Sequence, residues 1–63
     1  MKKKVLIISG GISKERLISL DTGLQVAREL KKNGYNVKIS EPDISLARKI
    51  KQFKPKVIFN ALH

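Results

Sequence analysis

The segment KVLIISGG, Lys4 to Gly11, decides the fold. Its apolar run is continuous rather than alternating, which is typical of a parallel β-strand that is covered on both faces. Two glycines follow at once, and glycine lets a backbone turn sharply or lets another group come close. From the sequence alone the glycine pair has two explanations, an ordinary tight turn or the close approach of a ligand.

A helical pattern follows the glycines. Its apolar residues recur at spacings of three and four, which predicts one core-facing stripe: Leu17, Leu20, Leu24, Ala27 and Leu30. Gly34, after two lysines, suits a left-handed cap at the carboxyl end of this helix. Either Ser13 or Ser19 could cap its amino end, with an acidic residue in the first turn in both cases. We favour Ser19, which leaves residues 10 to 18 as an exposed loop.

Two more strands and one more helix complete the pattern. Tyr35 to Ser40 alternates between apolar and polar side chains, which predicts a second strand with one wetter face. A second helix would begin after a cap at Asp43 or Ser45 and stop before Pro55. Its apolar residues again repeat at helical spacing: Leu46, Ala47, Ile50 and Phe53. The third strand is predicted over Lys56 to Ala61.

The order β-α-β-α-β predicts an α/β fold. Right-handed crossovers between strands give a three-stranded parallel sheet, with the first strand central and the order 2-1-3. Ligands of such sheets bind at the carboxyl ends of the strands, so Glu15 and His63 are expected at one rim. The third strand is expected to leave an unpaired edge and an unfinished core, which complete domains avoid.

Length and composition limit the function classes. The chain has 63 residues, enough for one small domain that buries only about 60% of its unfolded surface, so we expect marginal stability. It lacks cysteine, which is compatible with a reducing, cytoplasmic setting. The apolar run Val5 to Ile8 is too short for a signal peptide, and we expect no membrane partner.

The net charge is +9, from 14 lysines and arginines against five aspartates and glutamates. The basic residues are spread along the chain and the aromatic residues are few: Tyr35, Phe53 and Phe59. Because basic and aromatic residues do not alternate, we expect a solvated basic surface and no nucleic-acid partner. A small basic module that binds nucleic acid or another acidic partner remains the alternative reading.

Few residues could carry chemistry. The glycine pair matches neither the dinucleotide fingerprint nor the phosphate-binding loop. Glu15 could simply favour the helix start, or its carboxylate could hold a substrate ammonium, and Arg16 could fix the loop or face an anion. His63 could donate a proton, bind an anion or have no role. With one histidine and no cysteine we expect no metal site, and Asn60 fits a polar group at the sheet end.

Two segments carry a resemblance to a known family. Gly10 to Gly23, GGISKERLISLDTG, resembles the signature Gly-Gly-x-Ser-x-Glu-Arg-x-Val-Ser-Leu-x-Ser-Gly of D-alanine:D-alanine ligases. Lys54 to His63, KPKVIFNALH, resembles the third strand of that family, which runs into His-Gly-x-x-Gly-Glu-Asp-Gly. Their separation fits as well. Leu17 stands where the family usually has a polar residue, and Thr22 replaces a usual serine.

The resemblance implies an ATP-grasp ligase that joins two D-alanines through a D-alanyl phosphate to give D-alanyl-D-alanine for peptidoglycan. Residues 1–63 would be part of its Rossmann-like, substrate-binding amino-terminal domain. By the match, Glu15 and His63 are the catalytic candidates, Glu15 holding the ammonium of the first D-alanine and His63 lying by its carboxyl end. Ile18 would line the methyl pocket. The remaining substrate-binding candidates are Gly10, Gly11 and Ser13.

The family's ATP and Mg²⁺ ligands would lie outside these residues, and we expect the 63-residue piece to be inactive alone. The resemblance also implies a cytoplasmic enzyme and a homodimer. It leaves the second substrate open between D-alanine, D-lactate and D-serine.

Overall fold

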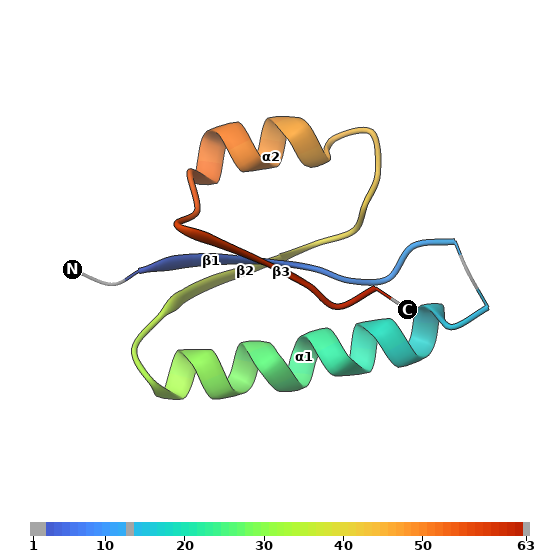
Figure 1. The fold of residues 1–63 in the computed structure, drawn as a ribbon, viewed down its shortest axis with the longest axis horizontal. Coiled ribbons are helices and arrows are strands. Elements are labelled where there is room, and N and C mark those ends of the chain that lie inside the picture. The colour runs from blue at the N-terminus through green and yellow to red at the C-terminus, as the bar shows by residue number, and fades with distance from the viewer. Residues whose placement is uncertain (1–2, 13, 63) are drawn as a thin grey trace.

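The computed structural model describes residues 3–12 and 14–62 and confirms the α/β fold. Three strands and two helices alternate along the chain: β1 Lys4–Ile8, α1 Arg16–Lys32, β2 Asn36–Ser40, α2 Leu46–Phe53 and β3 Val57–Asn60. The three strands, which Figure 1 labels, form one parallel sheet, and their order is β2-β1-β3, as predicted. The carboxyl ends of the three strands therefore lie at the same edge of the sheet.

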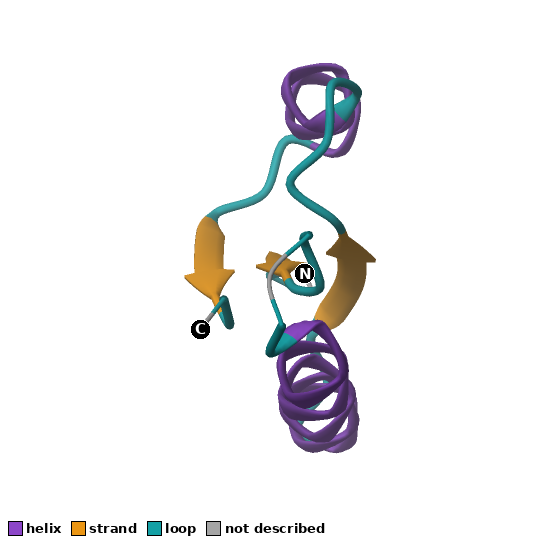
Figure 2. Cartoon of the chain, turned by 90° about the vertical axis from the view of Figure 1, so that its right-hand side faces the viewer, coloured by secondary structure: helices purple, strands orange, loops and turns teal. Residues whose placement is uncertain are grey.

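The sheet lies between the two helices, α1 on one face and α2 on the other (Figure 2). The central strand is the most deeply buried element, with Val5, Leu6 and Ile7 at most 4% exposed. On the α1 face, Val5 and Ile7 form the core with Ala27 and Ala61. The continuous apolar run of β1 is thus explained by cover on both faces.

The predicted start of α1 is wrong. The helix begins at Arg16, with Glu15 in the cap position, so Ser19 lies inside the first turn instead of capping it. The serine side chain is buried and its hydrogen bonds go to two other segments. The loop before the helix is also shorter than predicted, and Gly10 within it is buried. The other candidate cap, Ser13, lies outside the described residues.

The residues of α1 that are fully buried against the sheet are small. Leu17 and Leu24, both expected in the core, are 78% and 49% exposed. The buried residues of the helix are Ser19, Gly23 and Ala27. A Cβ on Gly23 would lie 2.8 Å from the Cβ of Ser9, so the helix approaches the residue that follows β1 too closely there for any side chain. The predicted stripe is therefore wrong at Leu17 and Leu24 and right at Ala27 and Leu30, the latter partly buried against the core.

The carboxyl end of α1 confirms the predicted glycine cap. Gly34 has φ +87°, in the left-handed region. Its N–H donates to the carbonyl of Lys31 at 3.0 Å, and the N–H of Tyr35 donates to the carbonyl of Leu30 at 3.1 Å. These two bonds form a Schellman motif, in which Tyr35 and Leu30 also pack against the core.

Helix α2 is held more loosely than α1, because each of its residues keeps some exposure. At its start, Asp43 Oδ1 accepts from the N–H and the hydroxyl of Ser45, and these bonds lower the pKa of the Asp43 carboxyl. At its end, the ring of Phe53 lies 5.5 Å and 5.7 Å from the ammonium groups of Lys4 and Lys38. Each such contact contributes about 0.5–1 kcal/mol at an exposed position.

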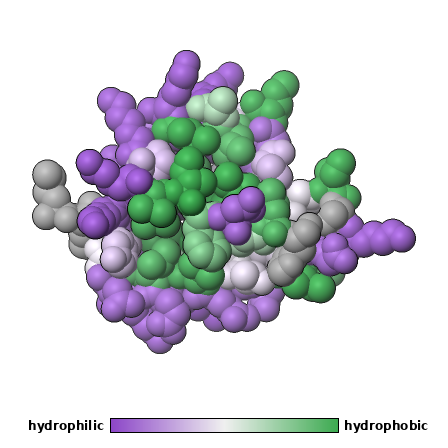
Figure 3. Space-filling view, viewed as in Figure 1, coloured by the Kyte–Doolittle hydropathy of each residue, from purple (hydrophilic) through white to green (hydrophobic). Residues whose placement is uncertain are grey.

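Strand β3 is the uncovered edge that the sequence predicts. Its apolar side chains Val57, Ile58 and Phe59 each remain about half exposed. The space-filling view shows apolar atoms gathered over the middle of one face, where Figure 1 draws β3 (Figure 3). The core of these residues is therefore incomplete on the β3 side.

Candidate functional site

The glycine loop, the start of α1 and the ends of all three strands meet at one rim of the sheet. The N–H of Ala61 donates to the carbonyl of Ile8 at 2.9 Å, and the N–H of Ser9 donates to the carbonyl of Ser40 at 3.0 Å. The prediction that the ends of β1 and β3 are neighbours is confirmed. His63 lies outside the described residues, so its proximity to Glu15 stays a prediction.

The backbone conformation favours glycine at both loop positions, and a neighbouring carboxylate also crowds Gly10. Gly10 and Gly11 have φ +93° and +91°, a region that other residues rarely adopt. A Cβ on Gly10 would also lie 2.6 Å from Oε1 of Glu41. The tight turn is therefore confirmed, and the Glu41 side chain comes close to Gly10, while the approach of a ligand to the pair stays a prediction.

Both glycine N–H groups are used inside the protein. The N–H of Gly10 donates to Oγ of Ser19 at 2.8 Å, and the N–H of Gly11 donates to Oε1 of Glu41 at 3.2 Å. A phosphate-binding loop needs such groups turned towards its ligand. This loop therefore differs from nucleotide-binding loops in hydrogen bonding as well as in sequence.

Ser19 joins three segments of the rim. Its buried hydroxyl accepts from Gly10 and donates to the carbonyl of Ala61, both at 2.8 Å. Sequence reasoning assigned this serine to a helix cap and missed the bridge. The available signal was its spacing of four from Gly23 and of eight from Ala27, which places three small residues on one helix face.

Glu41 is a residue of this rim that sequence reasoning missed altogether. It follows β2 directly and reaches the loop, where Oε2 accepts from Nη2 of Arg16 at 2.6 Å. The two side chains are 42% and 41% exposed. Of the two roles considered for Arg16, this geometry supports the fixing of the loop. The available signal was an acidic residue at the carboxyl end of a strand beside the central one.

Glu15 and Ile18 lie at the start of α1, next to this fixed loop. The side chain of Glu15 is exposed, and its backbone carbonyl accepts from the N–H of Ser19 at 2.9 Å. Ile18 is 55% exposed, so its side chain can still bury apolar surface against a ligand. Both candidates are thus accessible at the rim. Ser13, the remaining loop candidate, lies outside the described residues.

Ser9 lies behind the loop, and its hydroxyl is buried. It is fully buried, and Oγ has no hydrogen-bond partner among the described residues. Its neighbour across the interface is Gly23, which leaves room for the hydroxyl. The position therefore requires a small side chain, while the oxygen itself gains nothing from burial.

Other expectations concern the rest of the surface. Asn60 is the last residue of β3, as expected of a polar group at the sheet end, and its side chain accepts from the N–H of Leu62 at 2.9 Å. Among residues 3–12 and 14–62, His, Cys, Asp and Glu form no group of three that could hold a metal ion. No helix in the same ranges is long and apolar enough to cross a membrane.

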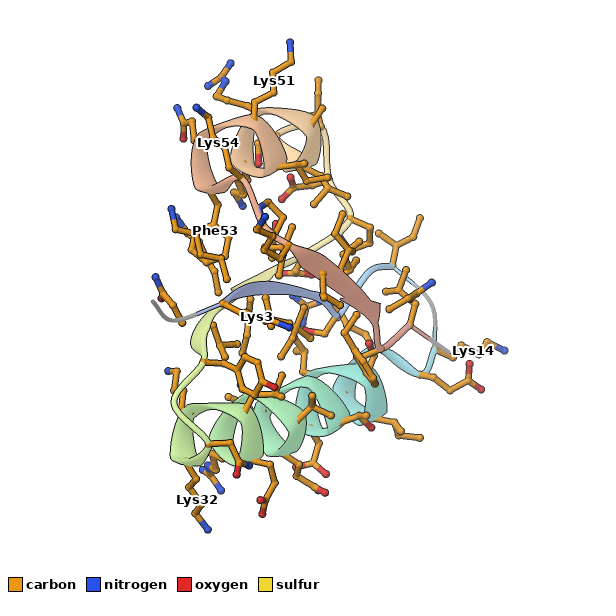
Figure 4. The ribbon with its side chains drawn as sticks, turned by 60° about the vertical axis from the view of Figure 1, so that its left-hand side comes forward. Lys3, Lys14, Lys32, Lys51, Phe53 and Lys54 are labelled. Carbon is orange, nitrogen blue, oxygen red and sulfur yellow. The ribbon has the colours of Figure 1, made fainter. Side chains whose placement is uncertain are left out.

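The basic residues are distributed over several elements. Figure 4 labels five exposed lysines near the chain start, in the loop, at the end of α1 and around α2: Lys3, Lys14, Lys32, Lys51 and Lys54. They point in different directions into solvent. This distribution agrees with a solvated basic surface more than with a concentrated patch for a polyanion.

No family model matches the chain. Curated proteins of similar sequence do match it, and they indicate its family. A D-alanine–D-alanine ligase of Pelagibacter ubique is 75% identical over 63 residues, which is all of this chain and 21% of that protein. The ligase of Zymomonas mobilis is 45% identical over 98% of the chain and 19% of its own length. That of Pseudothermotoga lettingae is 44% identical over 95% of the chain and 21% of its own length.

The chain thus spans about a fifth of the length of these relatives. The resemblance inferred from the glycine loop and the third strand is confirmed along the whole chain, and it covers the amino-terminal region of the relatives.

Proposed function

We propose that these residues are the amino-terminal, substrate-binding part of a D-alanine–D-alanine ligase, which uses ATP to join two D-alanines. The observation that carries the proposal is the 75% identity over the whole chain with a protein of that name. The comparisons favour this function over a small basic binding module. The location of the glycine loop at the carboxyl ends of parallel strands supports a ligand-binding role for the same rim.

In this proposal the loop binds the first D-alanine. The Glu15 carboxylate accepts a charge-assisted hydrogen bond from the substrate ammonium. Ile18 packs against the substrate methyl group, for which its 55% exposed side chain is suitably placed. His63 lies beside the substrate carboxyl group and helps to place its charge. Gly10, Gly11 and Ser13 contribute the shape of the loop that surrounds the substrate.

The contribution of these residues is orientation and charge placement. Joining two zwitterions requires the ammonium of one to be held while its carboxylate stays open to activation. ATP supplies the phosphoryl group that activates that carboxylate, and Mg²⁺ neutralises the phosphate charge. Both N–H groups of the loop glycines already have protein partners, so we do not assign this loop to the phosphates of ATP. We assign ATP and Mg²⁺ to parts of the protein beyond this segment.

The proposal extends to the setting of the full-length protein. Its product would enter peptidoglycan synthesis, and we place the enzyme in the cytoplasm, a reducing setting with which the lack of cysteine in this chain is compatible. We propose a homodimer, as the resemblance implies. The second substrate is assigned as D-alanine on the names of the relatives.

The test is phosphate release from ATP by the full-length gene product, with D-alanine or L-alanine supplied. D-alanine-dependent release, together with formation of the dipeptide, is the expected result. Equal release with both enantiomers, or release with neither, would refute the ligase assignment.

A further inference from the structure

Glu41 contacts the glycine loop on both sides of Glu15. Its Oε1 accepts from the N–H of Gly11, before Glu15, and its Oε2 accepts from Arg16, directly after it. Glu41 stands 30 positions from Gly11 and 25 positions from Arg16, so the contact is tertiary. One carboxylate therefore fixes both ends of the segment that carries the proposed ammonium-binding group.

The loop needs such a fixed point. Two successive residues with φ near +90° interrupt its backbone, so it cannot continue the ladder of β1. Ser19 holds the loop at Gly10, deep in the protein, but this bond lies ahead of Gly11 and Glu15. Beyond that bond, the carboxylate of Glu41, which directly follows β2, holds the loop at Gly11 and Arg16.

We propose that Glu41 is a positioning residue for the first-substrate site, setting the place of Glu15 through Gly11 and Arg16. This inference rests on the proposed function of Glu15 and adds a residue that acts on substrate through the loop.

The contact between Arg16 and Glu41 differs from an ion pair that only stabilises the fold. Since Arg16 and Glu41 are two-fifths exposed, the pair adds little to global stability. A small displacement of a binding group, in contrast, has a large effect on binding and rate.

The expected signature is therefore selective. In the full-length protein, Glu41→Ala removes both contacts and should raise the KM for the first D-alanine about tenfold. The KM for ATP and the urea midpoint should stay close to those of the wild type. Glu41→Gln keeps an oxygen for Gly11 but loses the charge opposite Arg16. Its KM for the first D-alanine should therefore lie between the values of the wild type and Glu41→Ala.

The matched control is Asp43→Asn. This carboxylate lies two positions further on, is exposed, and bonds to Ser45. Its kinetics should equal those of the wild type.

A double-mutant cycle then tests whether the contact between Glu41 and Arg16 acts as a unit. Adding Arg16→Gln to Glu41→Gln should cost little more than either change alone, whereas fully additive losses would refute the proposed contact.

A second readout separates this inference from the ligase assignment. Lys14 and Arg16 are trypsin sites within or next to the loop, and cleavage there needs no substrate. Glu41→Ala should be cut faster at these bonds than Asp43→Asn. Equal cleavage rates would overturn the positioning role even if the wild type proves to be a ligase.

If the wild type instead shows no D-alanine-dependent turnover, the ligase assignment fails, and the site role proposed for Glu41 falls with it. An equal rise in both KM values together with a lower urea midpoint would show a general stabilising role and overturn the proposal.

Discussion

Replacing Ser19 with alanine should destabilise this segment more than any other serine change. The substitution leaves two buried backbone groups, the N–H of Gly10 and the carbonyl of Ala61, without the hydroxyl that now bonds to each at 2.8 Å. Each buried polar group left unpaired costs about 1–3 kcal/mol. Because the loop can relax and recover part of the loss, we expect about 2–4 kcal/mol in total.

Native-state hydrogen exchange in the full-length protein measures this loss where it occurs. The amides of β1, at Leu6 and Ile7, exchange only when the segment opens, so their protection reports its opening free energy. A loss of 2–4 kcal/mol corresponds to a fall in protection of about 30- to 700-fold, since each 1.4 kcal/mol is a factor of ten.

The control for this experiment is Ser45→Ala. Its hydroxyl donates to the exposed carboxylate of Asp43 at 2.6 Å, and the partner can bond to water once the hydroxyl is gone. We expect a change within about 0.5 kcal/mol. If Ser19→Ala lowers β1 protection no more than Ser45→Ala does, the bridge carries no stability and the reasoning is wrong.

Three further predictions concern neighbouring positions. Ser9→Ala removes a buried hydroxyl without a described partner, so the same exchange measurement should show unchanged or slightly higher stability; a loss above about 1 kcal/mol would contradict this. Gly23→Ala places a Cβ 2.8 Å from that of Ser9 and should cost about 1–3 kcal/mol despite the better helix propensity of alanine, whereas a stabilised variant would show that α1 is free to move away. His63→Ala should lower turnover without lowering the melting temperature, and unchanged kinetics would remove His63 from the site.

The topology was predictable because its rules act over the whole chain. A continuous apolar run, connections too long for hairpins and the fixed hand of crossovers leave few arrangements of three strands. The glycine cap at Gly34 was predictable for a local reason, because few other residues adopt its backbone conformation.

The errors arose where packing distance decides the structure. Hydrophobicity selects Leu17 and Leu24 for the core, but the closest approach of a helix to a sheet is set by its smallest residues, here Ser19 and Gly23. A capping preference likewise reflects only hydrogen bonds to the neighbouring backbone, whereas the hydroxyl of Ser19 donates to a carbonyl at a strand end 42 positions away.

The contact between Glu41 and the glycine loop left little trace in the sequence. Its partners lie 25 and 30 positions away, and the spacing of an acidic residue after a strand does not say which loop it will reach. The fold had to be known first, because the contact depends on β2 and the loop ending at the same edge of the sheet.

The central claim is that this segment holds the ammonium of the first D-alanine through Glu15, and one kinetic comparison tests it most directly. In the full-length protein, Glu15→Gln keeps the size of the side chain and removes its charge, with Asp21→Asn on the exposed part of the same helix as the control. The account predicts that Glu15→Gln raises the KM for the first D-alanine by about tenfold or more, since a hydrogen bond between charged groups is worth about 1.5–3 kcal/mol, while the KM for ATP stays unchanged. Equal changes in the two KM values, or values that match those of Asp21→Asn, would contradict it.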